Sequence, residues 1–247
     1  KEGQGMSTIK LKMKKLDYET NESYKTLRTN LQFCGEDKKV IVMTSCTPNE
    51  GKSTVATYLA SAMAQAGKRV LLIDGDLRKS LFTGNFEITD EVKGMAHLLS
   101  GQASLEEVIC NTDQAGLDVV FSGPVPPNPT ELLGDKAFKN MIKKCREMYD
   151  YVFIDSPPLG SVIDSAIIAE SCDGSIIIIE AEVISYRFVQ EIKEQLEKSN
   201  CPILGTILNK VDVRGQKYYS RYYGKKYGYG KYYKYGHYGK EERERNH

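Results

Sequence analysis

The sequence predicts an α/β fold with a doubly wound, mostly parallel sheet. Up to about residue 210, short apolar runs rich in β-branched residues alternate with amphipathic stretches, which is the order of βαβ units. The chain has 247 residues, of which 40% are hydrophobic and 27% charged, and this composition suits one globular domain. The longest aliphatic runs, 70–73 and 176–179, are far shorter than the roughly 20 residues of a membrane-spanning helix. We therefore expect no helix of this chain to cross a bilayer.

Six apolar runs are predicted as strands and five amphipathic stretches as helices. The strands are expected at residues 39–44, 69–74, 117–121, 151–155, 175–180 and 203–208. The helices are expected at residues 19–33, 52–66, 130–148, 164–171 and 186–198. Strands that alternate with helices in this way pair mainly in parallel, in one sheet.

The composition divides the chain into an N-terminal segment 1–18, a main domain 19–213 and a tail 214–247. The tail holds ten Lys or Arg and three Asp or Glu, a net charge of +7, which leaves −6 for the rest because the whole chain carries +1. It lacks Val, Ile, Leu and Met, so we expect it to be flexible. Residues 1–5 precede Met6 and are interpreted as an added remnant. No apolar run follows the N-terminal lysines, so the cytosol is the expected compartment.

The first predicted strand leads into a phosphate-binding loop. Residues 44–54 read Thr-Ser-Cys-Thr-Pro-Asn-Glu-Gly-Lys-Ser-Thr, and an amphipathic helix follows, as in P-loop NTPases. Backbone N–H groups at the start of that helix would face phosphates, Lys52 would bridge the β- and γ-phosphates, and Ser53 would bind Mg²⁺. Cys46 stands where the motif has its first Gly. The expected nucleotide-binding residues of this loop are Asn49, Glu50, Gly51, Lys52, Ser53 and Thr54.

The second strand ends in two acids, Asp74 and Asp76. The carboxyl ends of parallel strands line the ligand crevice, and residues two apart point to the same side. Two carboxylates aimed at one place repel each other unless a cation lies between them, so both are predicted to serve a metal ion. A solvated loop after the strand is the alternative interpretation.

Two later strands also end in polar residues. The strand 151–155 ends in Asp155 and is stopped by Pro157 and Pro158, which is typical of a Walker B strand whose Asp serves Mg²⁺. The strand 203–208 is followed by Asn209, which is predicted either to hydrogen-bond the edge of a nucleotide base or to form a turn.

The combination of these motifs resembles the bacterial tyrosine kinases (BY-kinases) of capsule and exopolysaccharide synthesis. The run 123–133, Gly-Pro-Val-Pro-Pro-Asn-Pro-Thr-Glu-Leu-Leu, and the tyrosines of the tail are further matches, and the resemblance covers nearly the whole chain. It implies Walker A roles for Lys52 and Ser53, Walker A′ roles for Asp74 and Asp76, and a Walker B role for Asp155. The domain 19–213 would then be a P-loop kinase domain that uses ATP and Mg²⁺.

The same resemblance implies partners and regulation. It implies autophosphorylation of the tail between subunits of a ring-like homo-oligomer, with a stretch Glu22, Lys25 and Arg28 that forms the ring, where Lys25 replaces the family's Arg. It also implies a cytoplasmic location peripheral to the membrane. The activator would be the cytoplasmic segment of a separate membrane polysaccharide co-polymerase, as in Gram-positive bacteria, and a protein-tyrosine phosphatase would be a further partner.

The chemistry of the acceptor adds one residue role. A tyrosine hydroxyl has a pKa near 10 and is protonated at neutral pH, so a carboxylate near the attacking oxygen is needed. Asp74 is predicted to be that base, or to share the metal. The predicted acceptors are Tyr218, Tyr219, Tyr222, Tyr223, Tyr227, Tyr229, Tyr232, Tyr233, Tyr235 and Tyr238.

Other functions are compatible with parts of the sequence. The strongest rival is a nucleotide-switch ATPase of the partition and division-site type, which uses the same strand ends without a protein acceptor. A non-catalytic scaffold would bind nucleotide only. For the tail, interleaved Tyr and Lys also suit stacking on single-stranded nucleic acid, which we do not favour because no folded nucleic-acid-binding element accompanies them, or a solvated low-complexity segment.

Overall fold

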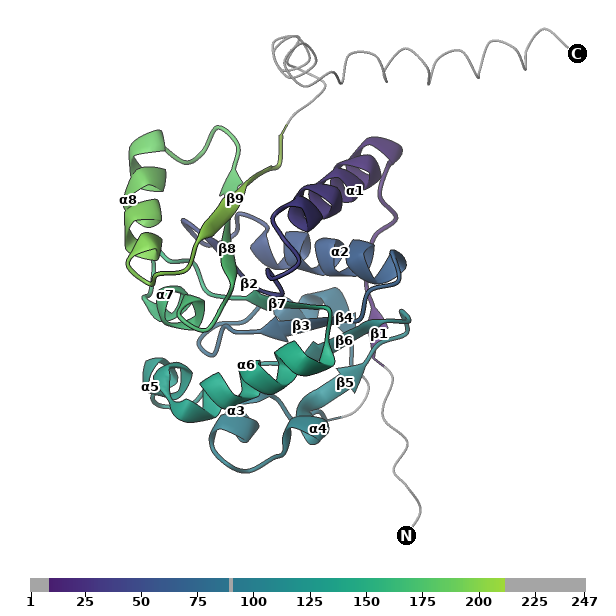
Figure 1. The fold of residues 1–247 in the computed structure, drawn as a ribbon, viewed down its shortest axis with the longest axis vertical. Coiled ribbons are helices and arrows are strands. Elements are labelled where there is room, and N and C mark those ends of the chain that lie inside the picture. Colours follow the sequence, from purple (N-terminus) through teal and green to yellow (C-terminus); the bar gives the residue numbers. More distant parts are fainter. Residues whose placement is uncertain (1–8, 89–90, 212–247) are drawn as a thin grey trace, which may run out of the picture. The chain divides into compact units, whose positions relative to one another are not determined.

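Seven strands build the central sheet of the protein. The computed structural model describes residues 9–88 and 91–211. The strands are β2 (Val40–Ser45), β3 (Val70–Asp74), β5 (Ile109–Asn111), β6 (Leu117–Val120), β7 (Tyr151–Asp155), β8 (Gly174–Glu180) and β9 (Ile203–Asn209). They lie in the order β5-β6-β3-β7-β2-β8-β9 (Figure 1), and every neighbouring pair is parallel except β5 with β6 at one edge. The predicted fold class is confirmed.

Helices cover both faces of this sheet. The longer ones are α1 (Tyr18–Phe33), α2 (Lys52–Gln65), α6 (Lys136–Met148) and α8 (Tyr186–Glu197). The shorter ones are α3 (Met95–Leu99), α4 (Leu105–Val108), α5 (Pro129–Gly134), α7 (Asp164–Ala169) and the 3₁₀ helix η1 (Phe82–Asn85). A separate two-stranded antiparallel sheet pairs β1 (Lys10–Leu11) with β4 (Phe86–Glu87). Figure 1 shows the central sheet between α2 and α6.

The apolar strands divide their side chains between two cores. In β2, Val40 and Val42 belong to one core and Ile41 and Met43 to the other, because successive side chains of a strand point to opposite faces. One core includes the buried faces of α6, α7 and α8, and the other the buried faces of α1 and α2. This arrangement explains why β2, β3 and β7 begin as continuous apolar runs and carry polar residues only at their carboxyl ends or first residue, as expected for a parallel sheet covered on both sides.

One predicted helix is wrong in its extent. The stretch 130–148 is two helices, α5 and α6, separated at Asp135, whose backbone is extended with φ −73° and ψ 161°. The carboxylate of Asp135 accepts a hydrogen bond of 2.8 Å from the N–H of Ala137 and so caps α6. An Asp inside an amphipathic stretch can begin a new helix, and the periodicity does not show this because both helices bury apolar residues in the same core.

Part of the N-terminal segment packs on the domain. Ile9 is buried, its N–H donates to the carbonyl of Asn111 at 2.9 Å, and its own carbonyl accepts from Asp113 at 2.9 Å. The compact unit ends at Asn209. In the part of the chain that the structure describes, no helix is long and apolar enough to cross a membrane.

Two Phe residues allow a matched test of the core. Phe138 in α6 is fully buried, whereas Phe33 at the end of α1 is 82% exposed. We expect Phe138→Ala to lower the free energy of unfolding by about 3–5 kcal/mol, because it removes apolar contacts and leaves a cavity. Phe33→Ala should change it by about 0.5 kcal/mol or less. Urea unfolding followed by circular dichroism measures both, and equal losses would contradict this assignment of the core.

Candidate functional site

The phosphate loop lies between β2 and α2, as the sequence predicts. Gly51 is the N-cap of α2 with φ +84°, a left-handed conformation that favours glycine, and it offers no side chain to cap the helix. Asn49 also has a positive φ, of 68°. The first-turn N–H groups of α2, from Lys52 onward, therefore have no side-chain cap, and a helix N-terminus of this kind binds anions such as phosphate.

The lysine of the loop is paired with Asp155, the acid predicted to end a Walker B strand. Lys52 Nζ forms a buried ion pair with Asp155 Oδ1, and Nζ also lies 3.4 Å from the hydroxyl of Ser53. Only about a tenth of the Lys52 side chain and 2% of that of Asp155 are exposed. The pair thus brings together the predicted Walker A and Walker B motifs, whose two residues are 103 positions apart in the chain.

Asp74 lies beside this pair. In the parallel pairing of β3 with β7, Asp74 is the register partner of Asp155. The carboxylate of Asp74 is fully buried and accepts hydrogen bonds from Ser80 Oγ at 2.6 Å and from the N–H groups of Ser122 and Asp76, both at 3.3 Å. Burial raises the pKa of Asp74 to about 7; the hydrogen bond from Ser80 lowers it and the charge of Asp155 raises it.

Asp76 is held by the turn that follows it. Its Oδ1 accepts hydrogen bonds of 3.0 Å from the N–H groups of Arg78 and Lys79. The guanidinium of Arg78 forms a bidentate pair with the buried Asp164 of α7, at 2.7 Å and 3.1 Å, and donates to Thr130 Oγ1 at 2.7 Å. This pair ties the turn that carries Asp76 to α7 and α5. Arg78 and Asp164 were not predicted as site residues, because 86 residues separate them and no local pattern indicates their contact.

Glu50 and Asn209 meet at the phosphate loop. The side-chain amide of Asn209 donates a hydrogen bond of 2.8 Å to the backbone carbonyl of Glu50. The carboxylate of Glu50 is almost fully buried and accepts from the N–H of Glu180 at 2.8 Å and from Thr47. In this structure both side chains contact protein groups of the loop and of the strand ends.

The groups at this edge of the sheet fit a magnesium nucleotide. Mg²⁺ is usually held by one or two carboxylates together with substrate phosphates. Asp74 and Asp155 supply carboxylates at neighbouring strand ends, Asp76 lies two residues after Asp74, and Ser53 supplies a hydroxyl beside Lys52. Among the described residues, no group of three or more His, Cys, Asp and Glu side chains forms a ready-made metal site. The cation would therefore need the phosphates as ligands.

Cys46, in place of the first Gly, is buried in the core. Burial raises the pKa of its thiol to about 11, and the nearby charge of Glu50 contributes to the rise. A thiol with a raised pKa is a poor nucleophile. Cys46 is thus a small core residue of the loop.

The three predicted ring residues lie on one helix, α1. The side chains of Glu22 and Lys25 pair with each other at 2.7 Å and are about half exposed. Arg28 donates to the carbonyl of Ala62 in α2 at 3.2 Å. Glu22 and Lys25 therefore remain accessible to a partner. The predicted acceptor tyrosines lie outside the described residues.

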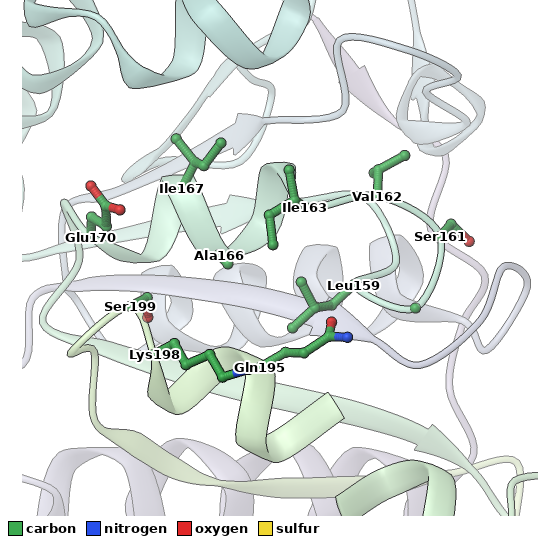
Figure 2. Close-up of a pocket in the computed structure, with 11 residues that line it drawn as sticks. Leu159, Ser161, Val162, Ile163, Ala166, Ile167, Glu170, Gln195, Lys198 and Ser199 are labelled. Carbon is green, nitrogen blue, oxygen red and sulfur yellow. The ribbon is translucent and has the colours of Figure 1, made fainter. Parts of the chain in front are cut away.

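A groove between α7 and α8 is distinct from the strand ends. It has a volume of about 570 Å³. Figure 2 shows Ala166 and Ile167 of α7 among the side chains that line it, together with Gln195 of α8 and Lys198, the residue that follows this helix. Its charged lining residues, Glu170 and Lys198, are of opposite sign. The side chains that line the groove therefore carry no net charge, which gives them no preference for a polyphosphate.

Comparison with known proteins identifies the family of this chain. An AAA domain family model matches residues 38–203. The chain is 47% identical over 193 residues to the tyrosine-protein kinase CpsD of Streptococcus agalactiae serotype III, covering 78% of this chain and 83% of that protein.

Solved structures show the same fold. The kinase domain of the Escherichia coli tyrosine kinase ETK matches with a TM-score of 0.75 and 32% identity, over 79% of this chain and 77% of that one. The septum site-determining protein MinD of Pyrococcus horikoshii, complexed with Mg-ADP, matches with a TM-score of 0.59 and 25% identity, over 69% of each chain. The similarity is thus weaker to the division-site protein than to the kinase.

The buried Asp74 makes the stability of the nucleotide-free protein depend on pH. Its pKa of about 7 exceeds the ordinary value of 3.8, so the folded protein takes up a proton that the unfolded chain does not. Stability from this group is therefore gained as pH falls below 7 and lost as pH rises through 7. Relative to Asp74→Asn, the wild type should gain up to about 1.4 kcal/mol per pH unit between pH 7 and pH 5.

Urea unfolding in EDTA measures this pH dependence. The control is Asp113→Asn, because the carboxylate of Asp113 is exposed and accepts one hydrogen bond, from the N–H of Leu11. Asp118 is unsuitable as a control because its carboxylate accepts a hydrogen bond from the hydroxyl of Tyr149. Parallel pH curves for the wild type and Asp74→Asn would contradict the assigned burial.

Proposed function

This chain belongs to the bacterial tyrosine kinases of capsule synthesis, and we propose that it transfers the γ-phosphoryl group of Mg-ATP to its own C-terminal tyrosines. The observation that carries the proposal is the buried Lys52–Asp155 ion pair at the N-terminus of α2. It supports a single site in which a phosphate-binding lysine and a metal-binding carboxylate act together.

The residues of the site suit phosphoryl transfer. When ATP binds, Lys52 leaves Asp155 for the β- and γ-phosphate oxygens, and the first-turn amides of α2 stabilise the negative charge. The acceptor hydroxyl attacks the γ-phosphorus in line, the bond to the β–γ bridging oxygen breaks, and ADP leaves. Asp74 takes the proton of the tyrosine hydroxyl, because it is the carboxylate beside Asp155.

Magnesium belongs to the same proposal. The Ser53 hydroxyl and the carboxylates of Asp155 and Asp76 would hold it, directly or through water, with Asp74 close by. The ion would neutralise charge on the transferred phosphoryl group. The hydrogen bonds from Arg78 and Lys79 would keep Asp76 in position for this role.

We also propose how the acceptor reaches the site. The segment 214–247 can span up to about 100 Å when extended, which is enough to enter a neighbouring subunit of a ring. Each phosphate adds about −1.5 to −2 charges at pH 7, so complete modification would change the net charge of this segment from +7 to about −8 to −13. The reversal would oppose assembly of the ring. A membrane activator with a cytoplasmic segment completes the proposed system.

Phosphotyrosine mapping tests the proposed transfer. With ATP and Mg²⁺, mass spectrometry should detect phosphotyrosine within residues 218–238, with and without the cytoplasmic fragment of a candidate activator. Lys52→Met should reduce the signal at least about 100-fold, because the charge on the phosphates is no longer neutralised. Replacing the ten tail tyrosines by Phe should abolish it while ATP binding stays unchanged.

The same assay separates the kinase from the nucleotide switch. Consumption of ATP with no labelled tyrosine, in the presence of the activator fragment, would support the nucleotide-switch ATPase. Nucleotide binding with neither ATP consumption nor labelling would support the scaffold. Equal labelling of the wild type and Lys52→Met would contradict the assigned site.

The ring has its own test on α1. We expect Glu22→Ala combined with Lys25→Ala to lower the assembly mass measured by light scattering, because both exposed charges of the proposed contact are lost. Lys193→Ala combined with Glu197→Ala removes a similarly exposed pair of 2.6 Å on α8 and serves as the control. If the wild type assembles and the α1 variant has the same assembly mass, the proposed contact through α1 is contradicted.

A further inference from the structure

The phosphate loop contains a buried carboxylate that its ligand chemistry does not explain. Glu50 directly precedes Gly51 and is 1% exposed. A buried carboxylate is costly unless it is fully hydrogen-bonded, and a negative charge in this loop repels a bound polyphosphate. Its presence in the loop therefore calls for a role other than contact with phosphate.

The contacts of Glu50 lead to the neighbouring strand. One oxygen accepts hydrogen bonds from the N–H of Thr47 and, at 3.1 Å, from the Thr47 hydroxyl. The other accepts from the N–H of Glu180, the last residue of β8, at 2.8 Å. A carboxylate can accept on both oxygens at once, whereas the side chain of Gln has only one acceptor oxygen. The carboxylate of Glu50 thus connects two residues of the phosphate loop, Thr47 and Glu50, to the end of β8.

Asn209 fixes the same residue from the next strand. It is the last residue of β9 and the register partner of Glu180 in the β8–β9 pairing. Its amide donates to the carbonyl oxygen of Glu50 at 2.8 Å. A Cβ atom on Gly51 would lie 2.3 Å from this amide nitrogen, so the amide occupies space that only glycine leaves free.

We infer that Glu50 and Asn209 are positioning residues that lock the phosphate loop onto the carboxyl ends of β8 and β9. The side chain of Glu50 is fixed to Thr47 and to the end of β8, and the backbone carbonyl of Glu50 is fixed by Asn209. The N–H groups that follow are thereby preorganised for phosphate, so ATP does not have to order the loop when it binds. This inference rests on the proposed nucleotide site and deepens it.

This role differs from recognition of the base by Asn209. A residue that contacts the base affects only ligands with a base. A residue that holds the loop affects every ligand that binds through its phosphates, with or without a base. The comparison of ATP with tripolyphosphate therefore distinguishes the two roles.

The experiment measures affinity in the full chain with Mg²⁺, using displacement of a fluorescent ATP analogue by ATP or by tripolyphosphate. We expect Glu50→Gln and Asn209→Ala each to raise the dissociation constant of ATP about tenfold, because each variant loses one hydrogen bond to the loop. In each variant, the dissociation constant of tripolyphosphate should rise by the same factor as that of ATP. The double variant should lose less than the product of the two factors, since both act on one loop.

Two exposed residues provide matched controls. Glu197→Gln on α8 and Asn140→Ala on α6 make the same chemical changes away from the loop and should leave both dissociation constants unchanged. Circular dichroism establishes that each variant is folded. Should Glu50→Gln not fold, Thr47→Val removes one donor to the same carboxylate and should produce a smaller loss of the same kind.

The outcomes are separable. Unchanged affinity in both folded variants would overturn the inference while the nucleotide site stands. Loss of ATP affinity with unchanged tripolyphosphate affinity in Asn209→Ala would show that Asn209 contacts the base, and would overturn its positioning role. A wild type that binds neither ligand would contradict the proposed function itself.

Discussion

The buried ion pair between Lys52 and Asp155 is the interaction on which the rest of the site depends. Taking two charges out of water is costly, and the cost is offset only when the geometry and the surrounding hydrogen bonds are favourable. Here the pair joins Lys52, at the start of α2, to Asp155, at the end of β7, and Asp74 is the carboxylate next to Asp155. A site that keeps its lysine paired in this way can exchange the carboxylate for phosphate oxygens when nucleotide binds.

Strand order brings the motifs together. In the order β3-β7-β2, the acidic strand end, the Walker B strand and the strand before the phosphate loop are immediate neighbours. Because these strands are parallel, their carboxyl ends share one edge of the sheet. On the other side of β2, β8 and β9 supply Glu180 and Asn209, which hold the loop. The whole sheet therefore positions a few polar groups.

Much of this was predictable from local pattern. Six apolar runs predicted the strands around the site, and Gly51-Lys52-Ser53 predicted the loop because its neighbours have the right period and order. Two features were not predictable: the division of the stretch 130–148 at Asp135, and the short strand pairings of β1 with β4 and of β5 with β6. Helix caps and edge contacts depend on tertiary packing. The contact of Arg78 with Asp164 spans 86 residues, and no local pattern announces it. Asn209 was predicted either to hydrogen-bond a nucleotide base or to form a turn, and its contact with Glu50 became visible only in three dimensions.

The central claim is that these separated motifs surround one magnesium nucleotide, and a crystal structure of the chain with Mg²⁺ and a non-hydrolysable ATP analogue tests it most directly. The account predicts Lys52 Nζ at the β- and γ-phosphates instead of at Asp155, and a cation between Ser53 and the carboxylates. An intact Lys52–Asp155 pair in the presence of bound nucleotide, or a nucleotide seated in the groove between α7 and α8, would contradict it.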